Sequence, residues 1–144
     1  MENRFLCKAK KVENKKRTEW VQGYYAVIGG REVIIKNQTE KYYVADEGKK
    51  ASGNEIVPIR LATLCRCTGL EDKNSTLIWE NDIIFLAKAE DFLCVRWDDS
   101  SARFYLQGTF RAVSFENYQD EEMEVISNIF DNPALQQEGA ENFR

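Results

Sequence analysis

The chain has 144 residues, which favours one domain or two small lobes, and its 43% hydrophobic and 31% charged residues fit a soluble globular protein. It has no apolar run of the roughly 18 residues that a membrane span needs and no signal peptide, so we expect a cytoplasmic protein. Histidine is absent, which removes the usual neutral-pH proton shuttle and the histidine-dependent catalytic dyads and triads.

The first half of the chain predicts short strands. The clearest pair is a hairpin of residues 20–28 and 31–36, because Gly29 and Gly30 supply the positive φ of a two-residue turn. In that register Ala26 faces Val33 and Tyr24 faces Ile35. A basic loop is expected at residues 10–18 and a mobile loop at 45–55. Other strands are predicted at residues 5–9, 42–44 and 56–59, where Pro58 indicates an edge or a bend.

The stretch from residue 68 to residue 85 predicts two short strands and their turns. Asp72 to Ser75 has the composition of a tight turn. Asn81 is expected to adopt positive φ, and Asp82 to accept a backbone hydrogen bond that fixes the entry into the next strand. We assign a structural role to the residues of this motif: Thr68, Gly69, Leu70, Asp72, Asn74, Asn81 and Asp82.

The second half continues with a period of two. Residues 92–97 and 102–106 predict a second hairpin, residues 110–115 alternate again, and residues 125–130 are expected to close a small SH3-like β-barrel. Asn132 before Pro133 caps a short helix through Gln137, and the last residues are expected to fray. The predicted fold is mainly β, α+β at most, with an N-terminal β-hairpin lobe (1–67) and an SH3-like barrel lobe with the central motif (68–144).

The central motif resembles that of the YopX family of phage and prophage proteins. Residues 19–24 and 124–135 resemble the corresponding family segments in the same order, so the resemblance covers most of the chain. The family usually has glycine at the positions of Ser75 and Asn81, and differs at residues 65–67. The resemblance implies a phage or prophage origin, no known catalytic residue, and a tendency to form homo-oligomers.

The chain has four cysteines, Cys7, Cys65, Cys67 and Cys94. We expect them to be reduced in a cytoplasmic protein and to act as small hydrophobic residues. The paired Cys-x-x-Cys spacing of structural zinc sites is missing. No glycine-rich phosphate loop is present either, so the sequence predicts no metal, no cofactor and no catalytic residue.

Two function classes follow from the surface residues. The first is a non-enzymatic interaction or self-assembling module that binds a host or phage protein through aromatic side chains of an exposed sheet. The residues of this candidate surface are Trp20, Tyr24, Tyr25, Tyr42 and Tyr43. Core packing is the alternative role, which we expect for about half of these aromatic residues, because apolar and polar residues alternate along the strands.

The second class is a nucleic-acid-binding accessory protein. Residues 1–17 carry a net charge near +5, and residues 116–144 a net charge near −7. The candidate phosphate contacts are Lys10, Lys11, Lys15, Lys16 and Arg17. An acidic protein is a poor binder of polyanions, so nucleic acid is not expected as a partner. The same charge asymmetry fits two solvated faces, or the assembly of subunits head to tail.

Overall fold

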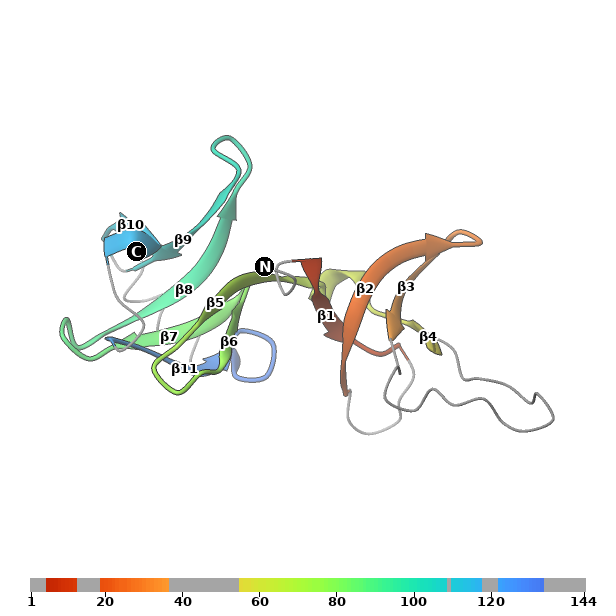
Figure 1. Ribbon diagram of the computed structural model, residues 1–144, viewed down its shortest axis with the longest axis horizontal. Helices are drawn as coiled ribbons and strands as arrows, with labels where there is room; N and C mark the ends of the chain where they lie inside the picture. The colour runs from red at the N-terminus through yellow and green to blue at the C-terminus, as the bar shows by residue number, and fades with distance from the viewer. Residues whose placement is uncertain (1–4, 13–18, 37–54, 109, 118–121, 134–144) are drawn as a thin grey trace. The chain divides into compact units, whose positions relative to one another are not determined.

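The computed structural model describes residues 5–12, 19–36, 55–108, 110–117 and 122–133 (Figure 1). Within these ranges the chain is mainly β, as predicted, and the two named helical elements are single 3-10 turns, η4 (Leu61–Thr63) and η5 (Phe115–Asn117). The strands of the first part are β1 (Cys7–Lys10), β2 (Trp20–Ile28), β3 (Arg31–Lys36) and β4 (Glu55–Pro58). Those of the second part are β5 (Cys65–Glu71), β6 (Leu77–Trp79), β7 (Asp82–Leu86), β8 (Asp91–Asp98), β9 (Arg103–Gln107), β10 (Ala112–Val113) and β11 (Met123–Asn128).

The chain divides into two compact units. The N-terminal unit comprises Phe5–Arg66, and the C-terminal unit contains the described residues from Cys67 onward. Two antiparallel sheets hold the strands, and β5 begins in the first unit and ends in the second. Each unit has its own cluster of buried apolar side chains.

The N-terminal unit is built on the predicted β2–β3 hairpin. Tyr24 pairs with Ile35 and Ala26 with Val33, which confirms the expected register. Gly29 and Gly30 have φ of 60° and 80°, so the turn has the left-handed residues that match the twist of a two-residue hairpin.

The sheet of this unit runs in the order β4, β3, β2, β1, followed by the first residues of β5. Pro58 lies on β4, the edge strand, as its missing N–H predicts. The core consists of Ala9, Val21, Ile34, Val57 and Ile59. The Thr63 hydroxyl of η4 accepts a hydrogen bond from the Lys10 N–H at 2.8 Å, which ties this turn to β1.

The C-terminal unit contains a five-stranded sheet in the order β10-β9-β8-β7-β11. One face carries the larger core of the protein, with all members almost fully buried: Ile78, Ile84, Leu86, Leu93, Val95, Leu106 and Met123. Ile78 comes from β6, which pairs with the end of β5. Short β7–β8 and β8–β9 connections make neighbouring strands antiparallel partners.

The predicted closed SH3-like barrel is not observed. The expected closing segment does form a strand and does return to β7, but with a register shift between Val125 and Ser127. At the other edge, β10 pairs with β9, and no pairing of β10 with β11 exists among the described residues. Residues 110–115 do not form one strand, because only Ala112–Val113 pair before the chain turns into η5. The sheet therefore stays open in the described part.

Other predicted elements lie outside the described residues. These are the strand at 42–44, the basic loop beyond residue 12, the loop at 45–54, and the C-terminal helix and tail beyond Pro133. The remaining predicted strands are present, with ends that differ by one or two residues.

Candidate interaction surfaces

Asp72 is a buried carboxylate in the turn between β5 and β6, with an exposed fraction of 4%. One oxygen accepts the N–H groups of Asn74 at 2.8 Å and Thr76 at 2.9 Å, and the other accepts the Val125 N–H at 2.8 Å. Burial raises the pKa of Asp72, but these three backbone donors outweigh burial and hold the pKa below its usual value. The ionised side chain thus fastens the turn to β11.

Hydrogen bonds with backbone groups also fix the turn between β6 and β7. Asn81 has a φ of 74°, the positive value expected for it, and its N–H donates to the Val95 carbonyl at 2.9 Å. Its own carbonyl accepts the Ile129 N–H at 3.1 Å. Asp82 is almost fully buried and accepts the Trp79 N–H at 2.8 Å, the backbone hydrogen bond expected at this position.

The rest of the motif also makes local contacts. The Thr68 hydroxyl donates to the Ile78 carbonyl at 2.7 Å and accepts the Leu70 N–H at 3.0 Å. Gly69 and Ser75 have φ of 84° and 65°. The geometry of the motif is therefore that of a folding element, in which polar side chains satisfy the backbone of tight turns.

The aromatic residues singled out in the sequence do not share one face. Trp20 and Tyr24 lie on one side of β2, and Tyr25 lies on the other, because successive strand residues point in opposite directions. Tyr24 and Tyr25 are exposed, whereas Trp20 is half-buried. Tyr42 and Tyr43 lie outside the described residues.

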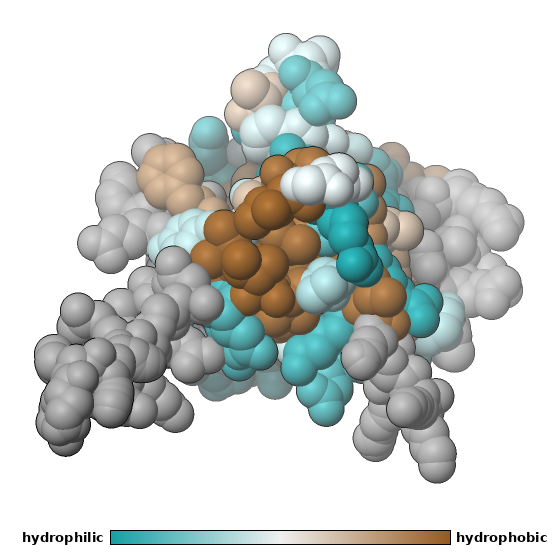
Figure 2. Space-filling view, turned by 90° about the vertical axis from the view of Figure 1, so that its right-hand side faces the viewer, coloured by the Kyte–Doolittle hydropathy of each residue, from teal (hydrophilic) through white to brown (hydrophobic). Residues whose placement is uncertain are grey.

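The outer half of the β2–β3 hairpin is apolar on both faces. Tyr24 and Ile28 point to the side of Ile35 and Ile56, while Tyr25 and Val27 point to the side of Ile34. Val27 is 56% exposed and Ile56 53%. We call the exposed side chains of this region the hairpin surface: Tyr24, Tyr25, Val27, Ile28 and Ile56. Figure 2 looks toward β2–β4, and apolar side chains gather at the centre of that view among hydrophilic ones.

Three members of the hairpin surface were not predicted from the sequence: Val27, Ile28 and Ile56. A signal for two of them was present in the run from Tyr24 to Ile28, which does not alternate. In a hairpin that buries one face, polar residues are expected at every second position, so an unbroken apolar run predicts apolar side chains on both faces.

The basic residues of the N-terminal segment are used locally where they are described. The Lys8 and Lys10 ammonium groups lie 4.7 and 5.4 Å from the centre of the Trp20 ring, within the range of cation–π contacts. Lys11 pairs with Glu19 at 3.3 Å. Of the candidate phosphate contacts, Lys15, Lys16 and Arg17 lie outside the described residues.

The four cysteines form no disulfide and have little access to solvent. Cys65, Cys67 and Cys94 are buried and Cys7 is half-buried. Burial raises the pKa of Cys94 to about 11, so this thiol is protonated at neutral pH and is a weak nucleophile. The described ranges contain no group of three or more potential metal-ligating side chains, and no helix in them has the length and apolarity to cross a membrane.

A comparison with known protein families supports the resemblance that the central motif indicated. The family model described as YopX protein matches residues 8–137, which is most of the chain and includes both units. No curated protein matches it. The match spans most of β1, the hairpin surface, the buried Asp72 and Asp82 turns and β11, and so the chain belongs to the YopX protein family.

Proposed function

We propose that this YopX-family chain is a non-enzymatic interaction module of phage or prophage origin, which acts in the bacterial cytoplasm and self-associates through the hairpin surface. The main observation in support is that the outer half of the β2–β3 hairpin exposes apolar side chains on both faces. Packing inside the unit covers one side of a sheet, so such a hairpin is stabilised when another molecule covers it.

A second copy of the chain is the occupant that the surface fits best. A two-fold contact places the same patch on both partners, so the apolar area of one hairpin surface meets an equal apolar area. Arg31 and Glu32 lie next to the apolar residues at the hairpin end, opposite Ile28 and Val27, so each copy offers both charges at the border of the contact. Burial of the apolar side chains supplies the driving force, at about 25 cal/mol per Å².

The absence of histidine supports a non-enzymatic role, as does the state of the candidate nucleophiles. Cys94 is buried and protonated, and the buried Asp72 and Asp82 carboxylates are bound to backbone N–H groups of their own turns. These groups have structural partners, which leaves them unavailable for general acid–base work.

The test is a dilution series of the full chain by multi-angle light scattering and sedimentation velocity. We expect an oligomer that dissociates on dilution, and a double variant, Val27→Ser with Ile28→Ser, that associates at least about tenfold more weakly. Leu61→Ser is the matched control, because Leu61 is an exposed apolar residue of the same unit outside the hairpin surface.

A monomeric wild type at about 100 µM would contradict self-association, since contacts of this kind reach micromolar affinity when they are specific. In that case, a defined host or phage protein that binds the wild type and fails to bind the double variant would identify a heterologous partner. Equal association of the double variant and the wild type would remove the hairpin surface from the proposal.

Nucleic-acid binding is the alternative function, and the grouping of Lys8 and Lys10 around Trp20 is the observation that favours it. We expect no such binding, because the chain has a net charge of −4. Fluorescence anisotropy with single- and double-stranded DNA at about 50 and 200 mM salt tests this. Salt-sensitive binding that disappears when Lys10, Lys11, Lys15, Lys16 and Arg17 are all made neutral would favour the alternative function.

We also propose that the C-terminal unit is an SH3-like barrel that stays open between β10 and β11. Two features support this reading: the last strand pairs with the first strand of the five-stranded sheet, and a single 3-10 turn, η5, precedes it.

A further inference from the structure

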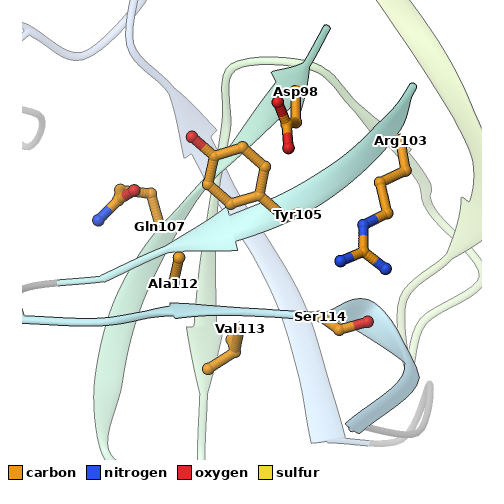
Figure 3. A pocket seen from close by; sticks show the side chains of 7 residues that line it. All are labelled: Asp98, Arg103, Tyr105, Gln107, Ala112, Val113 and Ser114. Atoms are coloured by element: carbon orange, nitrogen blue, oxygen red, sulfur yellow. The ribbon is translucent and has the colours of Figure 1, made fainter. Parts of the chain in front are cut away.

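The outer face of the five-stranded sheet contains a hollow of about 340 Å³ beside β9 and β10 (Figure 3). Its walls combine one basic, one acidic and several neutral polar side chains with an apolar part. The residues that matter for its chemistry are Asp98, Arg103, Tyr105, Gln107, Ala112 and Ser114. A space of this size accommodates a small molecule or a side chain with part of its backbone.

The side chains of β9 point alternately to the core and to the hollow. Phe104 and Leu106 pack into the core cluster of the C-terminal unit, so the alternate residues Arg103, Tyr105 and Gln107 point to the other face. Figure 3 shows Tyr105 between the other two along the strand. The hollow is thus lined by three side chains of one strand whose positions are fixed by a packed core.

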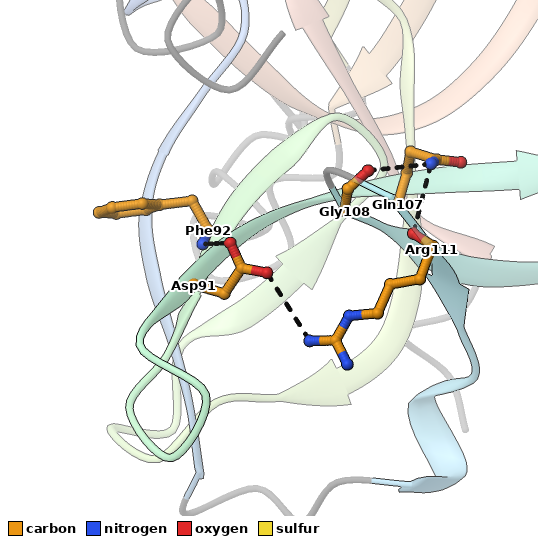
Figure 4. Close-up of polar contacts among 5 residues, drawn as sticks. All are labelled: Asp91, Phe92, Gln107, Gly108 and Arg111. Atoms are coloured by element: carbon orange, nitrogen blue, oxygen red, sulfur yellow. Dashed lines mark hydrogen bonds and ion pairs between the residues drawn. The ribbon is translucent and has the colours of Figure 1, made fainter. Parts of the chain in front are cut away.

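The wall at the β9–β10 turn is held by polar contacts (Figure 4). The Gln107 side-chain amide donates to the carbonyls of Gly108 at 3.1 Å and Arg111 at 3.3 Å, and the Gly108 N–H donates to the Arg111 carbonyl at 2.7 Å. Arg111 in turn pairs with Asp91 at 3.7 Å. These contacts fix the wall of the hollow in the absence of a ligand, so binding costs less conformational entropy.

Arg103 provides a positive charge that the described part of the chain does not neutralise. Asp98 is its partner in the strand register, but the Asp98 carboxylate accepts the hydroxyls of Ser101 at 2.7 Å and Ser100 at 2.8 Å. Figure 3 shows the guanidinium directed toward Ser114 and away from Asp98. The Arg103 guanidinium and the Tyr105 hydroxyl have no hydrogen-bond partner among the described residues.

We propose that this hollow binds a carboxylate group of a ligand with an apolar body, with Arg103 as the anchor. A guanidinium matches a carboxylate with two parallel hydrogen bonds, and the Tyr105 and Ser114 hydroxyls add neutral donors. The Tyr105 ring and Ala112, which pairs with Gln107, face the apolar part of the ligand. Asp98, which lies opposite Arg103 in the strand register, repels a second negative charge, which favours a carboxylate over a phosphate.

Two sources share this chemistry: a free small acid and an acidic side chain of a peptide. The test is a titration of the ¹⁵N-labelled full chain, followed by amide and arginine Nε shifts. The probes are N-acetyl-L-phenylalanine for the free acid and acetyl-Ala-Glu-Ala-amide for the peptide. The uncharged control is N-acetyl-L-phenylalaninamide, and inorganic phosphate serves as the competing anion.

We expect saturable shifts of β9, β10 and the Arg103 Nε at about 1–10 mM of at least one carboxylate probe, and at least about tenfold weaker binding of the amide. The probe that binds more tightly identifies the source. Arg103→Gln should abolish saturation and Arg103→Lys should weaken it severalfold, since the paired hydrogen bonds are lost while the charge stays. Arg111→Gln is the matched control, an arginine of the same hairpin whose charge is paired with Asp91.

The proposal is wrong if neither carboxylate probe saturates, if the amide binds as well as the acid, or if the Arg103→Gln variant binds like the wild type. Tighter binding of phosphate than of both carboxylates would likewise overturn it. Arg103 is exposed, and a thermal melt of each variant establishes that its fold is unchanged.

Discussion

The two units differ in their buried polar groups and in the size of their cores. The C-terminal unit buries Asp72 and Asp82 and gives their oxygens backbone donors, and its core residues are almost fully covered. The N-terminal unit has a smaller core and leaves Val27, Ile28 and Ile56 exposed. A unit with satisfied buried carboxylates is a self-sufficient scaffold, whereas a hairpin with uncovered apolar faces gains stability from a partner.

The largest expected effect on stability is that of removing the buried Asp72 carboxylate of the C-terminal unit. Asp72→Ala leaves the N–H groups of Asn74, Thr76 and Val125 without their acceptor, and we expect a loss of about 4 kcal/mol in the free energy of unfolding. Urea denaturation measures this loss. Glu71→Ala, which removes an exposed carboxylate next to Asp72, is the control and should change stability by less than about 0.5 kcal/mol. Equal effects of the two changes would show that Asp72 does not fasten the turn.

Gly23→Ala probes the close approach of β2 and β3 in the N-terminal unit. A Cβ at this position would lie 2.3 Å from the Ile35 carbonyl oxygen, a backbone atom that cannot move without disturbing β3. We expect a loss of about 3 kcal/mol. Gly29→Ala, where a Cβ would meet no atom within 4 Å, should cost only about 1 kcal/mol for its positive φ. A thermal melt compares the two variants, and similar melting temperatures would refute the close approach of β2 and β3.

Asn81 distinguishes backbone conformation from side-chain packing. Asn81→Val places a β-branched residue at a φ of 74° and should cost about 2 kcal/mol, whereas Asn81→Gly should stay within about 1 kcal/mol of the wild type. Chemical denaturation of both variants is the measurement. If valine were tolerated as well as glycine, the account of this turn would fail.

Acid should weaken the C-terminal unit through Asp72. Because its pKa in the folded state is lowered, its contribution to stability is complete above the unfolded value of about 3.9 and is lost as the pH falls through the folded pKa. The loss should be smaller than that of Asp72→Ala, since a neutral carboxyl still accepts hydrogen bonds. Between about pH 5 and pH 2, the free energy of unfolding should therefore fall more for the wild type than for Asp72→Asn. Parallel curves would assign the acid sensitivity to other groups.

The smallest expected change in monomer stability belongs to the hairpin surface. Val27→Ser with Ile28→Ser should alter the unfolding free energy of the dilute protein by less than about 1 kcal/mol, because both side chains are already exposed. Denaturation at low protein concentration measures it. A loss of several kcal/mol would mean that these side chains support the fold itself, and the contrast between the two units would disappear.

Local chemistry accounts for the parts of the fold that were predictable. Gly29-Gly30 between apolar runs fixed the hairpin register, and Asn81 and Asp82 indicated their turn. The predicted closure of the barrel is not observed among the described residues, because β10 ends where the chain leaves the sheet for η5, and tertiary packing decides that point. The hydrogen bond from Val125 to Asp72 joins residues 53 positions apart, a separation that no local pattern predicts.

The sites were less predictable than the strands. Tyr24 and Tyr25 were grouped by residue type, although neighbours on a strand point to opposite faces. The hollow beside β9 was not predicted. Its residues come from β8, β9 and β10, and they become neighbours only through the strand register, which places Arg103 opposite Asp98.

The most direct test of self-association through the hairpin surface is an isotope-filtered NOE experiment on a mixture of ¹³C-labelled and unlabelled chains. We expect intermolecular NOEs from the methyl groups of Val27, Ile28 and Ile56 to protons of the unlabelled copy. These signals should weaken on dilution, together with the oligomer. An oligomer whose intermolecular NOEs come only from other methyl groups, or the absence of any oligomer at the concentrations used for NMR, would contradict it.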